Sequence, residues 1–231
     1  MELDINKRFS EAPWVNNFPV TIGGLGGIGS NVAYLLAKHG VNATIYDFDM
    51  VELHNIGGQM FDRRDVGKNK VRAIIDKILF IDINLRWNTN RKFTQISKIT
   101  SVAFGCFDNM KARISFYNAW KNLYLSSTQE FKNNNPFILV DGRQNAETLD
   151  IYVVTPETME RYESEGLFDD SEVEDLPCNF KSTTHTGFLT SGIMVSAYTN
   201  YLANFNTQEN VRSIPFRIQF TISIMHYEST Y

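Results

Sequence analysis

A glycine-rich turn near the start of the chain constrains the fold more than any other feature. Residues 20–22 are β-branched and predict a short strand. The pattern G-x-G-x-x-G follows directly, with Gly24, Gly26 and Gly29 as its glycines. Apolar residues then recur at helical spacing over residues 30–39. Strand, tight turn and helix in this order are typical of an α/β domain with a parallel sheet.

The glycines of this turn have a chemical use as well as a conformational one. Without side chains they let the backbone approach a phosphate closely, and the helix that follows directs free N–H groups and a partial positive charge at the anion. Gly40 is placed to end the helix, and residues 41–46 predict a second strand, which completes a βαβ unit. The turn therefore predicts nucleotide binding, with a turn used only for helix packing as the alternative.

The kind of nucleotide is indicated by the residues after the second strand. Asp47 ends that strand about 20 residues beyond the turn, where a carboxylate can accept hydrogen bonds from ribose hydroxyls in ATP and NAD alike. Acidic, amide and lysine side chains follow at intervals that suit ATP better than a dinucleotide. They are Asp49, Asn55, Gln59, Lys68 and Lys70.

In these residues the chain resembles the ThiF/MoeB/HesA family, the bacterial relatives of the ubiquitin-activating enzymes. Members adenylate the C-terminal glycine of a small ubiquitin-like carrier. Their motif D-x-D-x-V-x-x-x-N-L-x-R-Q and the later G-x-x-K element are matched by Asp47, Asp49, Val51, Asn55, Gln59, Gly67 and Lys70. The resemblance implies that Asp47 holds the ATP ribose, and that Asn55 and Lys70 contact phosphate oxygens.

One position departs from the motif. The arginine expected directly before Gln59 is Gly58 in this chain. Two interpretations follow: Arg63 or Arg64 replaces it in space, or phosphate binding is weakened. The second would suit a relative that binds a nucleotide without catalysis.

A further element lies around residue 108. Residues 102–106 predict a buried strand, Asp108 and Asn109 stand at its carboxyl end, and Arg113 lies on the helix behind. Ligands of doubly wound sheets bind outside the carboxyl ends of the strands, so Asp108 is expected to face the same crevice as the glycine turn. The resemblance implies that Asp108 holds Mg²⁺, a cation that needs only one or two carboxylates. The alternative is that Asp108 caps the following helix.

The second half of the chain carries an acidic segment and a cysteine. Residues 160–177 hold eight carboxylates, which predicts a solvated connection that does not fold on its own. We expect a mobile crossover loop over residues 160–187, followed by an apolar helix over residues 188–202. Cys178 takes the place of the cysteine that forms a thioester or acyl-disulfide in some members of the resembled family. Lys181 and His185 would favour its thiolate and the carboxylates would oppose it; the alternative is a small packed residue without reactivity.

Three other residues are candidates for the site. Asp141 and Arg143 end a predicted strand on the ligand side, so they either contact the acyl substrate or form a structural ion pair. Arg8 fits loosely the R-[YF]-[SD] stretch whose arginine, in the resembled family, reaches the ATP phosphates of the partner subunit. The alternative for Arg8 is an exposed side chain in a frayed terminus. Cys106, within an apolar strand, is expected in the core.

Composition limits the class of protein. A chain of 231 residues, 43% of them hydrophobic, supports one α/β domain, whereas a net charge of −4 and a pI of about 5.6 argue against nucleic-acid binding. No apolar run approaches the length that spans a bilayer, and the first residues do not form a signal peptide. Two cysteines exclude a disulfide framework. We therefore expect a cytoplasmic protein without membrane or nucleic-acid partners.

The sequence thus predicts a single Rossmann-like domain over residues 1–231, with a largely parallel sheet, helices on both faces and an antiparallel C-terminal extension. Residues 1–115 are expected to bind ATP and Mg²⁺, and residues 116–231 to receive the C-terminal tail of a small ubiquitin-like carrier protein or peptide. The predicted reaction is adenylation of that carboxylate in a homodimer. If Cys178 is reactive, the acyl group is then transferred to it as a thioester. An NAD-dependent oxidoreductase is the alternative from another class, although the sequence offers no acid–base pair for hydride transfer.

Overall fold

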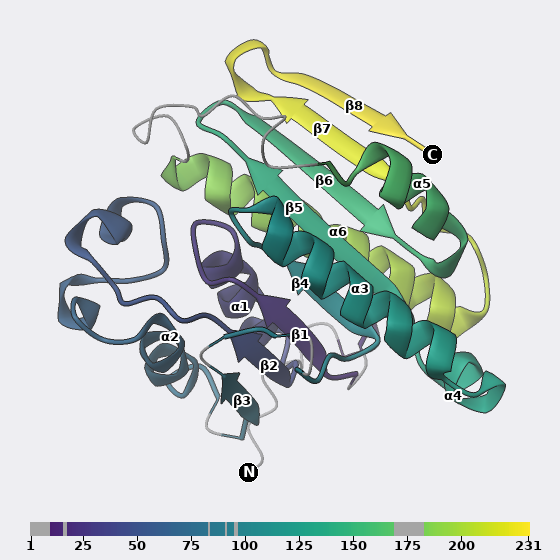
Figure 1. Ribbon diagram of the computed structural model, residues 1–231, viewed down its shortest axis with the longest axis horizontal. Helices are drawn as coiled ribbons and strands as arrows, with labels where there is room; N and C mark the ends of the chain where they lie inside the picture. Colours follow the sequence, from purple (N-terminus) through teal and green to yellow (C-terminus); the bar gives the residue numbers. More distant parts are fainter. Residues whose placement is uncertain (1–9, 16–17, 83, 91, 95–96, 169–182) are drawn as a thin grey trace.

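The computed structural model describes residues 10–15, 18–82, 84–90, 92–94, 97–168 and 183–231. Their strands form one eight-stranded sheet in the order β3-β2-β1-β4-β5-β6-β7-β8 (Figure 1). The strands are β1 (Val20–Gly23), β2 (Ala43–Tyr46), β3 (Trp87–Asn90), β4 (Val102–Gly105), β5 (Ile138–Gln144), β6 (Thr148–Val154), β7 (Arg217–Thr221) and β8 (His226–Thr230). The first five in sheet order are parallel and the last three antiparallel, as predicted.

The helices cover both faces of this sheet (Figure 1). They are α1 (Gly29–Lys38), α2 (Lys70–Ile78), α3 (Met110–Ser126), α4 (Gln129–Asn134), α5 (Met159–Glu165) and α6 (Thr184–Thr207), with short 3-10 turns that include η2 (Leu53–Gly57) and η3 (Arg63–Asp65). One core cluster joins α1, α2 and α6 to the sheet, and a second joins α3 and α5 to its other face. None of the helices in the described ranges is long and apolar enough to cross a membrane.

The order of the strands places a switch point between β1 and β4. The chain builds β1, β2 and β3 outward in one direction and then returns to place β4 on the other side of β1. Gly23, the last residue of β1, is level with Tyr46 of β2 and Gly105 of β4. The segments that follow these three strands therefore leave the sheet side by side, at the edge where doubly wound folds bind ligands.

The described part of the acidic segment after β6 contains a helix that its composition did not predict. Residues 159–165 form helix α5, so the expected crossover loop over residues 160–187 is too wide, and α6 already begins at Thr184. Met159 and Tyr162 are buried against α3, whereas the carboxylates point outward, where Glu163 pairs with Lys121 at 2.5 Å. Two apolar residues at i, i+3 spacing were sufficient to dock a short helix.

The burial of β6 differs from what its residues predict. Residue types alternate over residues 149–154, a pattern that predicts a half-exposed strand, but residues 151–154 are buried on both faces. Ile151 and Val153 pack in the cluster under α6, and Tyr152 and Val154 in the cluster under α3 and α5. Helices pack on both faces of β6, in the antiparallel part of the sheet, as they do on the parallel strands. Alternation of residue types along a strand does not show which of its faces a helix covers.

The buried face of α1 gives a stability prediction. Leu36 is fully buried between α1 and the sheet, whereas Leu125 on α3 is 60% exposed. We expect Leu36→Ala to lower the free energy of unfolding by about 2–5 kcal/mol through lost burial and a cavity. Leu125→Ala is the matched control and is expected to change it by less than about 0.5 kcal/mol. Urea unfolding followed by circular dichroism measures both, and equal effects would contradict the assigned core.

Candidate active site

The glycines of the turn after β1 have different structural roles. Gly24 has a φ of +86°, and a Cβ there would lie 2.6 Å from the Cys106 carbonyl oxygen. A Cβ on Gly29 would overlap the carbonyl oxygen of Gly24. Gly26, by contrast, has no atom within 4 Å of the place a Cβ would take. Packing accounts for Gly24 and Gly29, whereas the space at Gly26 is open.

The segment that leads into α1 has unused backbone donors beside this open space. Ile28 stands at the N-cap position and makes no side-chain cap. Within the described ranges, no acceptor bonds to the N–H groups of residues 26–29. Together with the helix dipole, such N–H groups favour an anion, and a phosphate fits the open space beside Gly26.

Asp47 closes the turn from the end of β2. Its Oδ2 accepts a hydrogen bond from the Leu25 N–H at 2.6 Å, and its Oδ1 accepts one from the Asp49 N–H at 2.7 Å. Burial raises the pKa of Asp47, and the positive charge of Lys70 opposes this rise. Each carboxylate oxygen has a second lone pair, so Asp47 retains acceptor capacity for ribose hydroxyls.

Lys70, the first residue of α2, is buried beside Asp49. Its Nζ lies 2.8 Å from Asp49 Oδ2, and its backbone N–H donates to the Asp49 carbonyl at 2.9 Å. A bridge between Met50 and Asn69 joins the same two segments. The lysine predicted to contact phosphate is thus held by the second aspartate of the motif, and both belong to the same group of charges as Asp47.

Asn55 and Gln59 lie on and after the 3-10 turn η2. The buried Asn55 accepts the Glu52 N–H through Oδ1 at 2.8 Å, and its carbonyl accepts the Gln59 N–H at 3.0 Å. The Oε1 atom of Gln59 is buried and has no hydrogen-bond partner in the described part of the chain. An unpaired buried acceptor calls for a donor, which a water or a bound nucleotide can supply.

Ser30 connects the segment after η2 to the glycine turn, a role that the motif spacing did not predict. Its hydroxyl donates to the Gly26 carbonyl at 2.7 Å and accepts the Met60 N–H at 3.1 Å. The Thr184 hydroxyl, at the start of α6, donates to the Gly57 carbonyl. The only signal for Ser30 was its place directly after Gly29.

The structure locates the residues proposed to replace the missing arginine. Gly58 follows η2 and has open space where a Cβ would be. Arg64 is bound to Asp62 through two contacts, Nε to Oδ1 at 3.1 Å and Nη2 to Oδ2 at 3.0 Å. Arg63, beside it in η3, is exposed. Of the two arginines, Arg64 is already engaged by a carboxylate.

Asp108 is exposed at the end of β4 and does not cap α3. Asn109 is the cap, because its Oδ1 accepts the Ala112 N–H at 2.9 Å, so the capping interpretation of Asp108 is wrong. Among the described residues, the Asn109 side chain donates to Asp108 Oδ1 at 3.0 Å. Its turn follows Cys106, whose carbonyl faces Gly24, and therefore leaves the sheet beside the glycine turn.

The surroundings of Asp108 suit a cation that keeps several water ligands and takes few ligands from the protein. In the ranges that the structure describes, no three His, Cys, Asp or Glu side chains gather into a metal site. Mg²⁺ bound between a protein and a nucleotide keeps several waters and needs only one or two carboxylates, so an exposed Asp108 is sufficient.

Asp141 and Arg143 form a structural ion pair. Asp141 is 1% exposed, and Arg143 Nε donates to its Oδ2 at 2.9 Å. Burial would raise the pKa of Asp141, but Arg113 and Arg143 together hold it below its ordinary value. Cys106 is a core residue, as predicted, and burial raises the pKa of its thiol far above the ordinary range.

Several predicted site residues lie outside the described residues. These are Arg8, Cys178 and Lys181. His185, expected near Cys178, lies exposed in the first turn of α6 and has Nε2 3.3 Å from the Thr183 hydroxyl oxygen. The structure therefore brings together Gly24, Gly26, Gly29, Asp47, Asp49 and Lys70, with Asn55 and Gln59 on an adjoining segment and Asp108 at the neighbouring strand end.

A cavity of about 750 Å³ lies elsewhere, at the opposite edge of the sheet. Its walls come from the end of β6, the C-terminal half of α6 and the segment before β7, with Tyr201, Phe205 and Phe216 among the lining residues. Since β6 runs antiparallel to β5, the end of β6 lies beside the beginning of β5, away from the glycine turn. This cavity is therefore separate from the glycine turn.

The geometry of turn, helix and strand ends agrees with a match to a known protein family. The family model described as the ThiF family matches residues 14–214. The chain therefore belongs to the ThiF family.

Relatives and solved structures extend this assignment. Ubiquitin-like modifier-activating enzyme 5 of Aedes aegypti is 29% identical over 136 residues, which cover 51% of this chain and 34% of that protein. The enzyme of the same name from Drosophila pseudoobscura pseudoobscura is 32% identical over 115 residues, 42% of this chain and 29% of its own length. The match thus spans about a third of the length of these curated relatives.

The solved structures show a shared fold at low sequence identity. A crystal structure of E. coli MccB with MccA-N7isoASN covers 99% of this chain and 72% of its own, with a TM-score of 0.70 and 15% identity. MccB with ATP gives a TM-score of 0.66 at 16% identity, over 94% of this chain and 64% of that one. PaaA gives 0.67 at 16% identity, with the same coverage.

The contrast between two glycines yields a prediction about the turn. Gly24→Ala should lower the free energy of unfolding by about 2 kcal/mol or more, because alanine disfavours a positive φ and its Cβ would meet the Cys106 carbonyl. Gly26→Ala should leave it unchanged or raise it by up to about 1 kcal/mol. Thermal and urea unfolding of the two variants measure this difference; a destabilised Gly26→Ala would show that the space beside it is not open.

Proposed function

We propose that this domain adenylates the C-terminal carboxylate of a small ubiquitin-like carrier protein or peptide, with ATP as the second substrate. The observation that carries the proposal is the uncapped start of α1, where no acceptor among the described residues bonds to the N–H groups of residues 26–29 and the space beside Gly26 is open. Membership of the ThiF family supports it further. The names of the relatives support a ubiquitin-like or peptide acceptor, and the MccB structure with ATP supports this nucleotide.

The chemistry asks for positioning rather than for a general base. A terminal carboxylate is ionised at neutral pH, so it can attack the α-phosphorus of ATP directly and release pyrophosphate, which gives an acyl-adenylate. The N–H groups of residues 26–29 and the Lys70 ammonium would bind phosphate oxygens, and Asp47 would hold the ribose. Asp49 keeps Lys70 in place, and Asn55 and Gln59 would contact the nucleotide from the adjoining segment. Charge neutralisation and orientation are then the main contributions of the protein.

Asp108 is proposed as the protein ligand of Mg²⁺. The ion, when bound, neutralises phosphate charge, and an exposed carboxylate next to the glycine turn can hold it with few other protein ligands.

The second half of the chain is proposed to receive the carrier tail. In a further step, the Cys178 thiolate would attack the acyl-adenylate carbonyl, form a thioester and release AMP. The support for Cys178 is its place in the sequence, between the acidic segment and the threonine-rich start of α6. A cytoplasmic homodimer in which Arg8 reaches the partner's ATP belongs to the same proposal.

One observation favours a second function. Gly58 replaces the motif arginine, and Arg64 is occupied by Asp62. A relative that binds the nucleotide but does not activate a carboxylate would have this arrangement. The family assignment favours either of these functions over an NAD-dependent oxidoreductase.

Pyrophosphate exchange tests the proposed reaction. Candidate carriers that end in Gly-Gly should support exchange of labelled pyrophosphate into ATP when Mg²⁺ is present. Asp108→Ala should lower the exchange rate about 100-fold, because a preorganised charge at the phosphates is lost. Glu130→Ala, which removes an exposed carboxylate from α4, is the control and should exchange normally. Normal exchange by Asp108→Ala would refute the metal role, and ATP binding without any exchange would favour the second function.

Gly26→Ala tests the phosphate contact separately from catalysis. A Cβ would enter the open space beside the free N–H groups, so we expect ATP to bind at least about tenfold more weakly, a loss of about 1.4 kcal/mol. Fluorescence titration with a labelled ATP analogue measures this, and Gly192→Ala, on α6 and equally open, is the matched control. Unchanged affinity in Gly26→Ala would place the phosphates elsewhere.

A further inference from the structure

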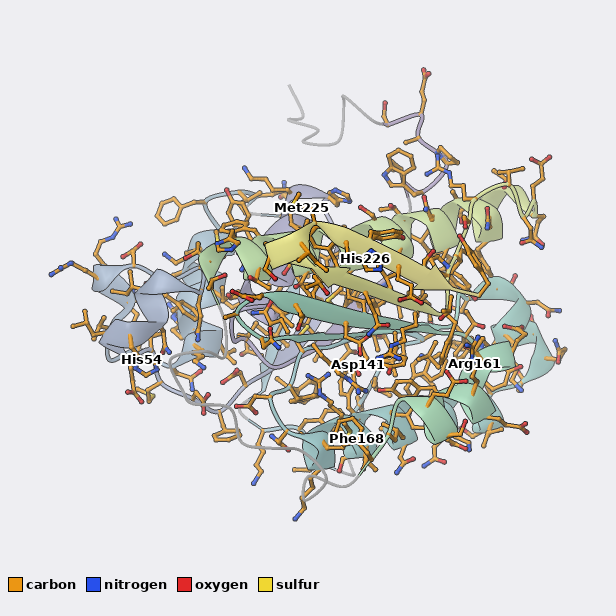
Figure 2. The ribbon with its side chains drawn as sticks, turned by 90° about the horizontal axis from the view of Figure 1, so that it is seen from above. His54, Asp141, Arg161, Phe168, Met225 and His226 are labelled. Carbon is orange, nitrogen blue, oxygen red and sulfur yellow. The ribbon has the colours of Figure 1, made fainter. Side chains whose placement is uncertain are left out.

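A buried ionic cluster lies in the middle of β5, level with the last residue of β4. Its centre is Asp141, which is 1% exposed and pairs in register with Gly105. A Cβ on Gly105 would lie only 3.0 Å from Asp141 Oδ1, so the glycine provides the room for this carboxylate. Figure 2 shows Asp141 in the interior, on the side of the sheet toward Phe168.

One arm of the cluster runs to the turn that carries Asp108. Arg113 of α3 donates through Nη1 to Asp141 Oδ1 and through Nη2 to the carbonyl of Phe107, the residue directly before Asp108. Its Nη2 also donates to the Gly142 carbonyl at 3.1 Å. Arg113 is 8% exposed, so these contacts are shielded from water and hold the backbone next to Asp108.

The other arm runs to the end of α5. Arg143 donates through Nε to Asp141 Oδ2 at 2.9 Å and through Nη2 to the Gly166 carbonyl at 2.5 Å. The Tyr162 hydroxyl donates to the same Oδ2 at 2.9 Å. Gly166 ends α5, so its position depends on a guanidinium that Asp141 orients.

The two arms share one carboxylate. The guanidinium groups of Arg113, which is 8% exposed, and of Arg143, whose side chain is 15% exposed, share the buried carboxylate of Asp141. The carbonyls of Phe107, Gly142 and Gly166 accept further N–H groups of these two arginines. Loss of one partner of a buried ionic group leaves an uncompensated charge, and the rest of the group must rearrange. A change in one arm therefore alters the geometry of the other.

We propose that Asp141 is a positioning residue that couples the end of α5 to the turn that carries Asp108. The consequence for activity rests on the proposed function. Asp108 is the proposed metal ligand, and in the sequence α5 comes shortly before Cys178. We call the turn that carries Asp108 the metal turn. Through Asp141, a shift of α5 would move the metal turn, and a shift of the metal turn would move α5.

Hydrogen exchange of the ligand-free protein tests the coupling. The Ala112 amide, bound to Asn109 Oδ1, reports the metal turn, and the Gly166 amide, bound to the Tyr162 carbonyl at 2.8 Å, reports the end of α5. Arg143→Lys keeps the positive charge but loses the guanidinium group that donates to both Asp141 and Gly166. The Arg143→Lys variant should exchange the Ala112 amide hydrogen at least about fivefold faster than the wild type, although Arg143 does not contact Ala112. Arg113→Lys should speed exchange at Gly166 in the same way.

Arg161→Lys is the matched control on α5. Arg161 contacts Glu165 at 2.8 Å and the Tyr231 carbonyl at 2.6 Å, outside the Asp141 cluster. Arg161→Lys should leave hydrogen exchange at the Ala112 amide unchanged. In every variant that stays folded, the amides of α1 should exchange as in the wild type. If Arg143→Lys does not fold, Tyr162→Phe, which removes one hydrogen bond to Asp141, carries the same test.

Remote effects in both directions would support the coupling. Exchange that changes only in the substituted arm would overturn it and leave Asp141 a local structural residue. Because no nucleotide is added, this result stands apart from pyrophosphate exchange, so failure of the coupling and failure of the proposed function are distinguishable.

Discussion

The close approach of Gly24 to the Cys106 carbonyl is the contact on which the site depends. It is possible because β1 lies between β2 and β4 in parallel register, so that Gly23 ends level with Tyr46 and Gly105. The chain must turn sharply there, with a positive φ at Gly24, before α1 begins. The turn leaves the N-terminus of α1 open at the carboxyl edge of the sheet. A helix that began one residue earlier or later would direct its free N–H groups elsewhere.

Around this opening, hydrogen bonds and an ion pair hold the charged side chains in place. Asp47 binds the backbone of the turn and of its own strand end, and Asp49 binds Lys70. The lysine is held by a bridge between its segment and the segment after β2. A positive charge and a helix N-terminus thus meet at one edge, and both favour a polyanion. A dinucleotide fold needs the turn and Asp47 but not this buried lysine, and for that reason the site suits a triphosphate better.

Local patterns predicted the elements that follow directly from residue spacing. The glycine turn, α1, the strand before Asp108 and the final hairpin all have short-range signals in the sequence, and the structure contains them. Long-range packing was less visible. The acidic helix α5 docks through Met159 and Tyr162, and β6 is covered on both faces, because other helices supply the apolar surface.

The same limit applies to the site. The motif spacing pointed to Asp47, Asp49 and Lys70, and the structure brings these three together. The motif spacing did not reveal that Asn109 rather than Asp108 caps α3, since either side chain suits a cap at that place. Nor could spacing show that Asp141 binds two arginines, one 28 residues before it and one two residues after it. Such clusters form only when the strands are assembled.

The most direct measurement of the central claim is calorimetric titration of the wild-type protein with ATP in the presence of Mg²⁺ and, in parallel, with NAD. The open turn and the buried lysine predict saturable binding of ATP at one site per chain and no heat of binding for NAD. Saturable binding of NAD, together with no binding of ATP, would contradict the account.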